Sequence, residues 1–567
     1  MSPRKEEMLN VETSYQGHDN LAFDTGPEDV ESPAAPEEKR KEVTGTAEGT
    51  ERGPDATPSG KATSGERTEQ GDASTKDVEA SDKGQGSSFI RNQVVCAVLA
   101  GLTHLAIGTI IGLPGVILPQ LTDPASPDIF FNTSEVALFG SLLHVGAMVG
   151  SLMGGGLNVY LGQRVTLLLS MPFALVLWLG MSFTSTVWVL QLIRALLGMT
   201  QGFIGAASAN YLAEVTQSEL RGRLMSFLDI GRQSGILLVY IVGSIELTWR
   251  EVMVVCGCVT TVPTFIGLLF LPNSPRWLVT RGRHDEAYDS LVFLRGPDHN
   301  SKLELQTIVD HFNQATANKQ STVEQLKQIR EPTIVYRLVF MGILTILLQF
   351  TGNLPIVTYV VPIFQAAKSQ LNSYGSAVSI ASLRVAGTVT FMVVVERMGR
   401  RTLLVASSLG CAVTLLFLGV YFLLQNMGAD VTSITWLPLV SLLVYMPFVV
   451  TIQAVVAILR SEIYPTSLRA VTVSIVYIVF FLAMFVVTQL FPVMVETTGE
   501  QGVFWTYAGS CLLMALMAAL LLPETRGQTL EEVDDTFRYG KKIQMRVPCI
   551  TGGVSDKDGG GSQSHVL

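Results

Sequence analysis

Long apolar stretches restrict this chain more than any other feature of its sequence. They are about 18–25 residues long and recur twelve times, and each is long enough to cross a hydrocarbon core of roughly 30 Å as a helix. A chain with 48% hydrophobic and only 15% charged residues is also unlike an ordinary soluble enzyme. The sequence therefore predicts an all-α membrane protein with twelve transmembrane helices, centred near Thr109, His144, Ala174, Gly202, Leu238, Val262, Gln349, Ala386, Thr414, Val449, Phe480 and Ala515.

The negative charge of the chain belongs to its N-terminal segment. Residues 1–88 contain 20 acidic and 10 basic residues, a net charge of −10, whereas the whole chain has −9. This segment has few branched apolar or aromatic residues, so we expect a disordered acidic tail that offers contacts to cytosolic partners. The rest of the chain is almost neutral, which argues against nucleic-acid binding.

A long polar interruption divides the apolar stretches six and six. It spans residues 272–337 and carries amphipathic segments, so we expect a small cytosolic helical linker domain. The predicted organisation is a tail (1–88), a six-helix bundle (89–271), the linker domain (272–337), a second six-helix bundle (338–522) and a cytosolic C-terminal tail (523–567).

Basic residues indicate the orientation in the membrane. The loops assigned to one side hold eleven arginines, whereas the other side offers mainly Arg250 and Lys368, and this asymmetry places both termini in the cytosol. The sequon Asn132-Thr133-Ser134 then lies outside, which makes Asn132 a candidate glycosylation site. We expect a multi-pass protein in contact with membrane lipid, in the plasma membrane. The eleven arginines are Arg164, Arg221, Arg223, Arg276, Arg281, Arg397, Arg400, Arg401, Arg460, Arg469 and Arg526.

Short motifs recur across the six-plus-six division. Glu214 and Arg221 are seven residues apart, as are Glu462 and Arg469. Two further pairs of motifs repeat in the same order, 162–164 with 399–401 and 272–276 with 523–526. A duplicated six-helix unit with a substrate path between its two copies accounts for these repeated motifs.

These motifs resemble the sugar porters of the major facilitator superfamily, and most of all the facilitated trehalose and hexose transporters of invertebrates. The resemblance implies a major facilitator fold and transport of a sugar such as trehalose or a hexose by alternating access. It covers residues 90–540 and rests on the strings Glu396–Arg401, Asn273–Leu278, Ser461–Pro465, Arg221-Gly222 and Pro523–Gly527.

The resemblance also implies two clusters of charged residues that lock the halves together on the cytosolic side when the cavity faces outward. The simpler alternative is that these charges only determine topology. The first cluster lacks charges at Val159, Gln163 and Asn273, where the family usually has them, so we expect the second cluster to contribute more of the locking energy. The proposed gating residues are Arg164, Glu214, Arg221, Arg400, Glu462, Arg469 and Glu524.

Ionisable residues inside apolar stretches are costly and point to function. Candidates are His104, His144, Arg194, Arg384 and the pair Asp229/Arg232, whose spacing of three places both side chains on one helix face. For each histidine, a role in the core or in a helix contact is a simpler reading than ligand binding. An Arg384 that faces Asp229 would suit an anionic or zwitterionic solute, and an Arg384 that merely pairs with Asp229 would be structural.

The family's sugar-binding positions are only partly retained. Leu348 and Leu354 stand where the family usually has Gln and Asn, and Ala457 replaces a tryptophan. The chain therefore either binds sugar through other ligands, such as Gln453, or takes a different organic solute. The candidate substrate-binding residues are Gln349, Asn353, Tyr359, Asp229, Gln233 and Arg384.

The first apolar stretch indicates whether transport is coupled to protons. The resemblance places Pro114 where proton-linked members have an aspartate, and residues 90–121 contain no acidic residue. We therefore expect passive facilitation (uniport), with Asp229 and His104 as the only residues that could support proton coupling instead. No catalytic triad, metal-ligand spacing or nucleotide-binding loop is found, so neither an enzyme nor a cofactor or metal is expected. A transport-deficient nutrient sensor is the remaining alternative.

Overall fold

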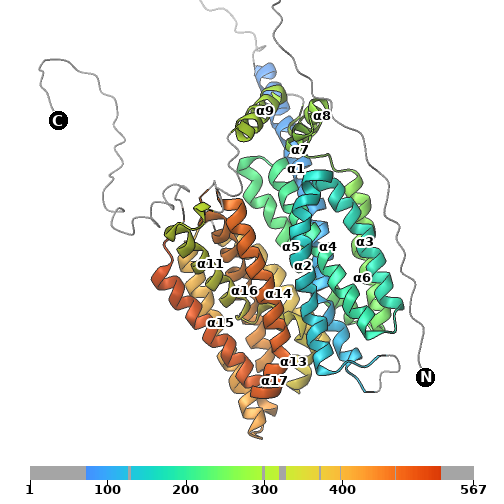
Figure 1. Ribbon diagram of the computed structural model, residues 1–567, viewed down its shortest axis with the longest axis vertical. Helices are drawn as coiled ribbons and strands as arrows, with labels where there is room; N and C mark the ends of the chain where they lie inside the picture. Colours follow the sequence, from blue (N-terminus) through green and yellow to red (C-terminus); the bar gives the residue numbers. More distant parts are fainter. Residues whose placement is uncertain are drawn as a thin grey trace, which may run out of the picture. The chain divides into compact units, whose positions relative to one another are not determined.

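The computed structural model describes residues 72–124, 129–296, 300–317, 327–368, 372–395, 397–465, 468–524 and 526. All regular structure in these residues is helical, and Figure 1 shows how the helices are arranged. The first six helices, which we call the first half, are α1 (Asp72–Leu121), α2 (Thr133–Leu161), α3 (Gln163–Phe183), α4 (Val187–Val215), α5 (Ser218–Gly243) and α6 (Trp249–Leu269).

The second half begins at Pro332, a residue type favoured at the start of a helix because its missing N–H is not needed there. Its helices pack mainly on one another and meet the first half where α5 faces α14 and where α2 faces α17. They are α11 (Pro332–Gln349), α12 (Asn353–Thr358), α13 (Val360–Ala366), α14 (Ser373–Val394), α15 (Arg400–Asn426), the short 3-10 helix η1 (Thr432–Ile434), α16 (Leu437–Glu462) and α17 (Arg469–Leu521).

Eleven of the helices described are long and apolar enough to cross a membrane, compared with the twelve expected. The difference lies in α17, whose 53 residues are far more than one crossing needs. Its backbone leaves the helical region at Gly499, with φ 70° and ψ 169°, so α17 consists of two helices that meet at a kink. Each predicted centre falls within a helix.

Three short helices lie between the halves in sequence: α7 (Pro275–Thr280), α8 (His284–Arg295) and α9 (Ser301–Ala317). They share a small core around Leu278, Val279 and Ala287. Figure 1 shows them gathered at one end of the bundle, beside the start of α1. We call this the linker end.

The linker helices are attached to the first half by hydrogen bonds. The Trp277 indole on α7 donates to the Val159 carbonyl at the end of α2, at 3.2 Å. Arg295 on α8 donates to the Val215 carbonyl at the end of α4, at 2.9 Å, and the Asn92 side chain on α1 donates to the Phe293 carbonyl, at 2.8 Å. The described residues of the linker domain predicted for 272–337 include the three helices α7, α8 and α9, and α11 begins five residues before its predicted end.

Helix α1 begins earlier than the composition predicts. Its backbone is helical from Asp72, so residues 72–88, which we expected to be part of a disordered tail, continue the first apolar helix. Extending an existing helix costs little compared with starting one, and this accounts for the polar extension. The prediction for residues 1–71 and most of the predicted C-terminal tail lie outside the described residues.

Close helix contacts inside the first half depend on glycine. A Cβ at Gly146 on α2 would lie 1.9 Å from the Ala195 carbonyl oxygen on α4, and one at Gly198 would lie 2.0 Å from the Leu143 carbonyl oxygen. Gly231 on α5 approaches the Gly101 carbonyl oxygen on α1 in the same way, at 2.1 Å. Small residues at such crossings let helix backbones touch, which is how helices associate in lipid without a hydrophobic driving force.

Candidate functional site

A cavity of about 540 Å³ lies between the two halves. Its walls combine helices α1, α2, α4 and α5 of the first half with α14, α16 and α17 of the second. The polar and charged residues that line it are His104, Ser151, Gln201, Asn210, Ser226, Asp229, Arg232, Gln233, Thr388, Gln453, Arg460, Ser474 and Tyr477. A cavity of this size, bordered by both halves, fits an organic solute.

The cavity reaches the linker end of the bundle. Its lining includes Asn210, near the end of α4, Ser226, near the start of α5, and Arg460, near the end of α16. These helix ends lie next to the loops that hold the predicted gating residues. The cavity therefore opens toward the side that we expect to be cytosolic.

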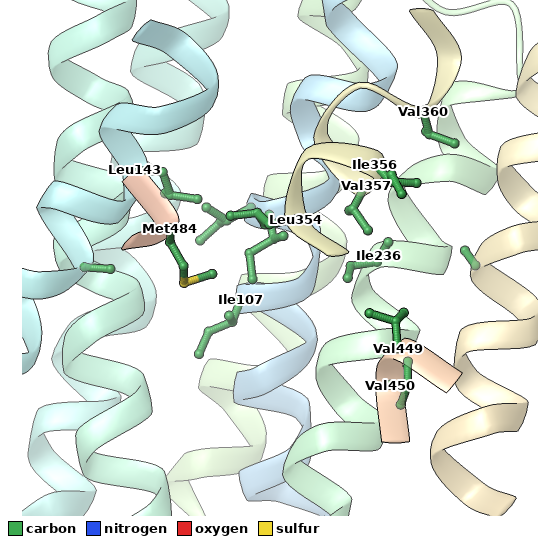
Figure 2. Close-up of a cluster of buried hydrophobic side chains, with 14 of the residues drawn as sticks. Ile107, Leu143, Ile236, Leu354, Ile356, Val357, Val360, Val449, Val450 and Met484 are labelled. Carbon is green, nitrogen blue, oxygen red and sulfur yellow. The ribbon is translucent and has the colours of Figure 1, made fainter. Parts of the chain in front are cut away.

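The opposite end is closed by contacts between the halves. The Tyr240 hydroxyl on α5 donates to the Val357 carbonyl on α12, at 2.6 Å, and the Ser141 hydroxyl on α2 donates to the Gln489 side chain on α17, at 2.5 Å. Figure 2 shows buried apolar side chains from both halves that belong to one cluster, among them Ile107, Leu143, Ile236, Leu354, Val357, Val449 and Met484. Ile107 and Met484 of this cluster also line the cavity.

A small recess of about 20 Å³ adjoins the cavity, with which it shares Arg232 and Gln453 as lining residues. Its other polar lining residues are Gln349 on α11, Asn353 on α12 and Arg384 on α14. The helix is broken here at Gly352, whose φ of 85° is in the left-handed region. The break lets Asn353 start a new helix beside the recess.

Arg384 is the central residue of the recess and is only 2% exposed. Its Nε donates to the Gln233 side-chain oxygen at 3.1 Å, and its Nη1 donates to the Asn353 side-chain oxygen at 2.8 Å. Asp229 instead forms an ion pair with Arg232 at 2.6 Å. The expectation that Arg384 faces or pairs with Asp229 is therefore wrong, because the partner three residues away on the same helix occupies the carboxylate.

Five of the six candidate substrate-binding residues line the cavity or the recess. The exception is Tyr359, which lies in the closed end. Its ring stacks on Phe491 with 4.7 Å between centroids, and its hydroxyl donates to the Thr488 carbonyl at 3.4 Å. In this conformation Tyr359 is a packing residue of the closed end.

The other ionisable candidates divide between the cavity and the helix core. His104 lines the cavity, and its Nε2 lies 2.8 Å from the Ser208 hydroxyl. His144 is buried, and neither ring nitrogen has a hydrogen-bond partner among the described residues. Arg194 is buried too, where its guanidinium donates to the carbonyls of Ile110 at 2.7 Å and Phe139 at 3.3 Å.

The first predicted gate cluster surrounds Glu214. Both carboxylate oxygens accept from the Gln163 side chain at 3.1 Å, and the Ser274 hydroxyl donates to the same carboxylate. Arg164 donates to the Leu269 carbonyl at 2.7 Å, and Arg221 has a buried Nε without a partner among the described residues. The recorded hydrogen bonds of Glu214 thus come from neutral side chains.

The second predicted cluster is more strongly charged. Arg400 forms an ion pair with Glu462 at 3.3 Å. Glu524 accepts from the backbone N–H groups of Arg400 and Arg401, at 2.8 and 3.3 Å, and so holds the start of α15. Arg469 donates to the nearby Tyr464 carbonyl at 3.5 Å. These contacts all stay within the second half.

Arg460 is a cavity residue that the sequence analysis interpreted only as a topology signal. Its guanidinium lies over the rings of Tyr477 and Phe480, 4.6 and 4.8 Å from their centroids. The sequence did contain a hint, since Arg460 lies at the end of the apolar stretch centred near Val449. The structure places it in the last turn of α16. Its contact with α17 required the tertiary structure.

Residues 71–537 match the family described as "Sugar (and other) transporter". The chain belongs to this family. Among similar members, the facilitated trehalose transporter Tret1 of Polypedilum vanderplanki is 27% identical over 79% of this chain and 88% of its own length. A facilitated trehalose transporter Tret1-2 homolog of Drosophila sechellia is 28% identical over 82% of this chain and 94% of its own.

Solved structures of the sugar transporter family agree with the fold. The xylose transporter XylE of E. coli, in a partially occluded inward open conformation, superposes with a TM-score of 0.61 at 21% identity. The match covers 79% of this chain and 100% of that one. The all-helical, multi-pass membrane fold is thereby confirmed at the level of the family.

Proposed function

We propose that this protein is a facilitative transporter (uniporter) that moves a sugar such as trehalose or a hexose across a membrane by alternating access. The observation that carries the proposal is the cavity between the halves, which is open at the linker end and closed at the other. The trehalose transporters to which the chain is similar support a sugar as the substrate.

The conformation corresponds to one extreme of an alternating-access cycle. With the linker end in the cytosol, the cavity faces inward, and contacts such as Tyr240 to Val357 form the closed outer gate. The other extreme requires these contacts to break and the cytosolic ends of the halves to meet. Such an exchange is possible when the two states differ by only a few kcal/mol.

The gating residues have the properties needed for the outward-facing state. Arg221 and Arg469 each have a buried Nε without a hydrogen-bond partner among the described residues. A buried unmade hydrogen bond costs about 1–3 kcal/mol, and closure of the cytosolic side would bring acceptors from the opposite half to these groups. We therefore assign a gating role to Arg164, Glu214, Arg221, Arg400, Glu462, Arg469 and Glu524.

The surroundings of Arg194 support passive transport as part of the proposal. A proton-coupled carrier needs a group that takes up and releases a proton during the cycle, and a carboxylate next to a buried arginine could be such a group. Here the recorded partners of Arg194 are two backbone carbonyls, one of them Ile110 on α1, which do not titrate. Residues 90–121 of α1 contain no acidic residue that could take this role.

The finer topology is part of the same proposal. The kink at Gly499 would give α17 two crossings and the protein twelve in total. Both tails and the linker helices would then be cytosolic, Asn132 would be exposed outside as a glycosylation site, and the plasma membrane would be the location.

Uptake by the full chain in transporter-deficient cells tests the proposal. Labelled trehalose, glucose and fructose would be supplied with and without a protonophore to wild type, Gln349→Ala and Gln365→Ala. Gln365 is a matched control because it is exposed on α13, away from the recess. We expect saturable uptake that is insensitive to the protonophore and lower in Gln349→Ala only. A protein that reaches the surface but carries none of the sugars would contradict the proposal and favour a nutrient sensor.

A further inference from the structure

We infer that the central site takes an anionic sugar, a hydroxylated ring bearing one carboxylate, in preference to a neutral one. The inference rests on the proposed function and concerns the substrate class of the same cavity. It depends on four observations: the balance of charge around the cavity, the direction of the hydrogen bonds that leave Arg384, the unpartnered donor of Gln349, and the size of the recess.

Positive charge is in excess around the cavity and its recess. Their lining contains three arginines, Arg232, Arg384 and Arg460, and one acidic residue, Asp229. Asp229 is engaged by Arg232, and Arg460 lies over two aromatic rings. Arg384 remains as a buried cation whose recorded partners are neutral: two amide oxygens and the Met446 sulfur at 3.4 Å.

The hydrogen bonds around Arg384 have only one possible direction. A guanidinium donates and never accepts, so the oxygens of Gln233 and Asn353 must face Arg384 and their NH₂ groups must point away. Asn353 in turn donates to the Gln453 side-chain oxygen at 3.2 Å, which turns the Gln453 NH₂ group away from Asn353. The arginine therefore orients three amides: the Asn353 NH₂ group donates to Gln453, and the NH₂ groups of Gln233 and Gln453 are left to donate to a ligand.

Gln349 adds a further donor beside the recess. Its Nε2 is buried and has no hydrogen-bond partner among the described residues, although the residue is only 3% exposed. Buried donors of this kind need an acceptor. A carboxylate accepts at both oxygens and donates at neither, whereas a hydroxyl also brings a donor that needs its own acceptor.

The dimensions of the site suit a ring with one charged substituent. The recess of about 20 Å³ has room for a group about the size of one water, and the adjoining cavity of about 540 Å³ can hold one or two sugar rings. A carboxylate at the mouth of the recess, with one oxygen inside it, would compensate the charge of Arg384. The ring would lie in the cavity beside Gln453 and Asp229.

Glucuronate and glucose form a matched pair of probes, because they differ only in a carboxylate that replaces a hydroxymethyl group. Initial uptake of each would be measured in proteoliposomes that contain the full chain, for wild type, Arg384→Gln and Arg384→Lys. The readout is the ratio of glucuronate to glucose uptake within each preparation, which does not depend on how much protein is inserted. A charge-assisted hydrogen bond should make this ratio about ten to a hundred in wild type.

We expect Arg384→Gln to lower the ratio to about one or below and Arg384→Lys, which keeps the charge, to retain part of it. If neither variant folds, the ratio measured for the wild type still decides whether the site prefers the anion. Uptake of a lone anion carries charge and must respond to reversal of the membrane potential, whereas uptake of glucose must not. A wild-type preference for glucose, or a ratio unchanged in Arg384→Gln, would overturn the inference and leave the proposed function intact. Absence of uptake of both probes, and of trehalose, by inserted protein would reject the proposed function itself.

Discussion

The hydroxyl of Tyr240 on α5 lies 2.6 Å from the carbonyl oxygen of Val357 on α12, and this hydrogen bond joins the two halves at the closed end of the cavity. A contact made only in the inward-facing state of the proposed cycle shifts the equilibrium between the inward-facing and outward-facing states. A neutral hydrogen bond contributes about 1 kcal/mol, which corresponds to a roughly fivefold change in that balance.

Tyr240→Phe should therefore raise the outward-facing population about fivefold. The measurement is the rate at which a membrane-impermeant maleimide added outside labels a cysteine introduced at Ile107, a residue of the cavity wall. Tyr421→Phe is the control, since the Tyr421 hydroxyl donates to the Ala367 carbonyl at 2.8 Å within the second half. Equal labelling in the two variants would show that the Tyr240 contact is not part of the outer gate.

The two gate clusters should differ in their contribution to transport. Glu462→Gln removes the negative charge that pairs with Arg400. The hydrogen-bond donors to Glu214 are the neutral side chains of Gln163 and Ser274, so Glu214→Gln breaks no ion pair of this kind. We expect the initial uptake rate per protein at the surface to fall about tenfold in Glu462→Gln and less than threefold in Glu214→Gln, since charged pairs are the stronger ones. The reverse order would refute the prediction that the second cluster contributes more of the locking energy.

Gly352 should be intolerant of any side chain. Its φ of 85° costs a non-glycine residue about 1–2 kcal/mol, and a Cβ there would lie 2.4 Å from the ring of Tyr507. Gly352→Ala should lower the Tm of the purified protein by several degrees. Gly342→Ala is the matched control, because Gly342 lies in α11 with nothing within 4 Å of its added Cβ.

Asn132 combines two roles that separate variants can distinguish. Its side chain accepts from the Glu135 backbone N–H at 2.9 Å and caps α2, and its sequon is completed by Ser134. Ser134→Ala should remove the glycan and leave the cap, so the gel mobility of the protein should increase while its Tm stays unchanged. Asn132→Ala should change both, with a loss of about 1 kcal/mol from the cap. A wild type without any glycan would contradict the proposed outside location.

The sequence predicted what depends on local spacing. The length of each apolar stretch located the helices, and the spacing of three predicted the contact between Asp229 and Arg232. It could not predict the partners of Arg384, because Gln233 and Asn353 come from helices that only the tertiary fold brings together. The burial of Tyr359 in the closed end also depends on the conformational state of the two halves.

The attachment of α7, α8 and α9 has a mechanical consequence. Hydrogen bonds join α7 and α8 to α1, α2 and α4, and the ion pair between Arg295 and Glu304 joins α9 to α8, so the three helices should swing with the first half as one arm. At the end of that arm a small rotation of the first half becomes a large displacement relative to the tip of α16.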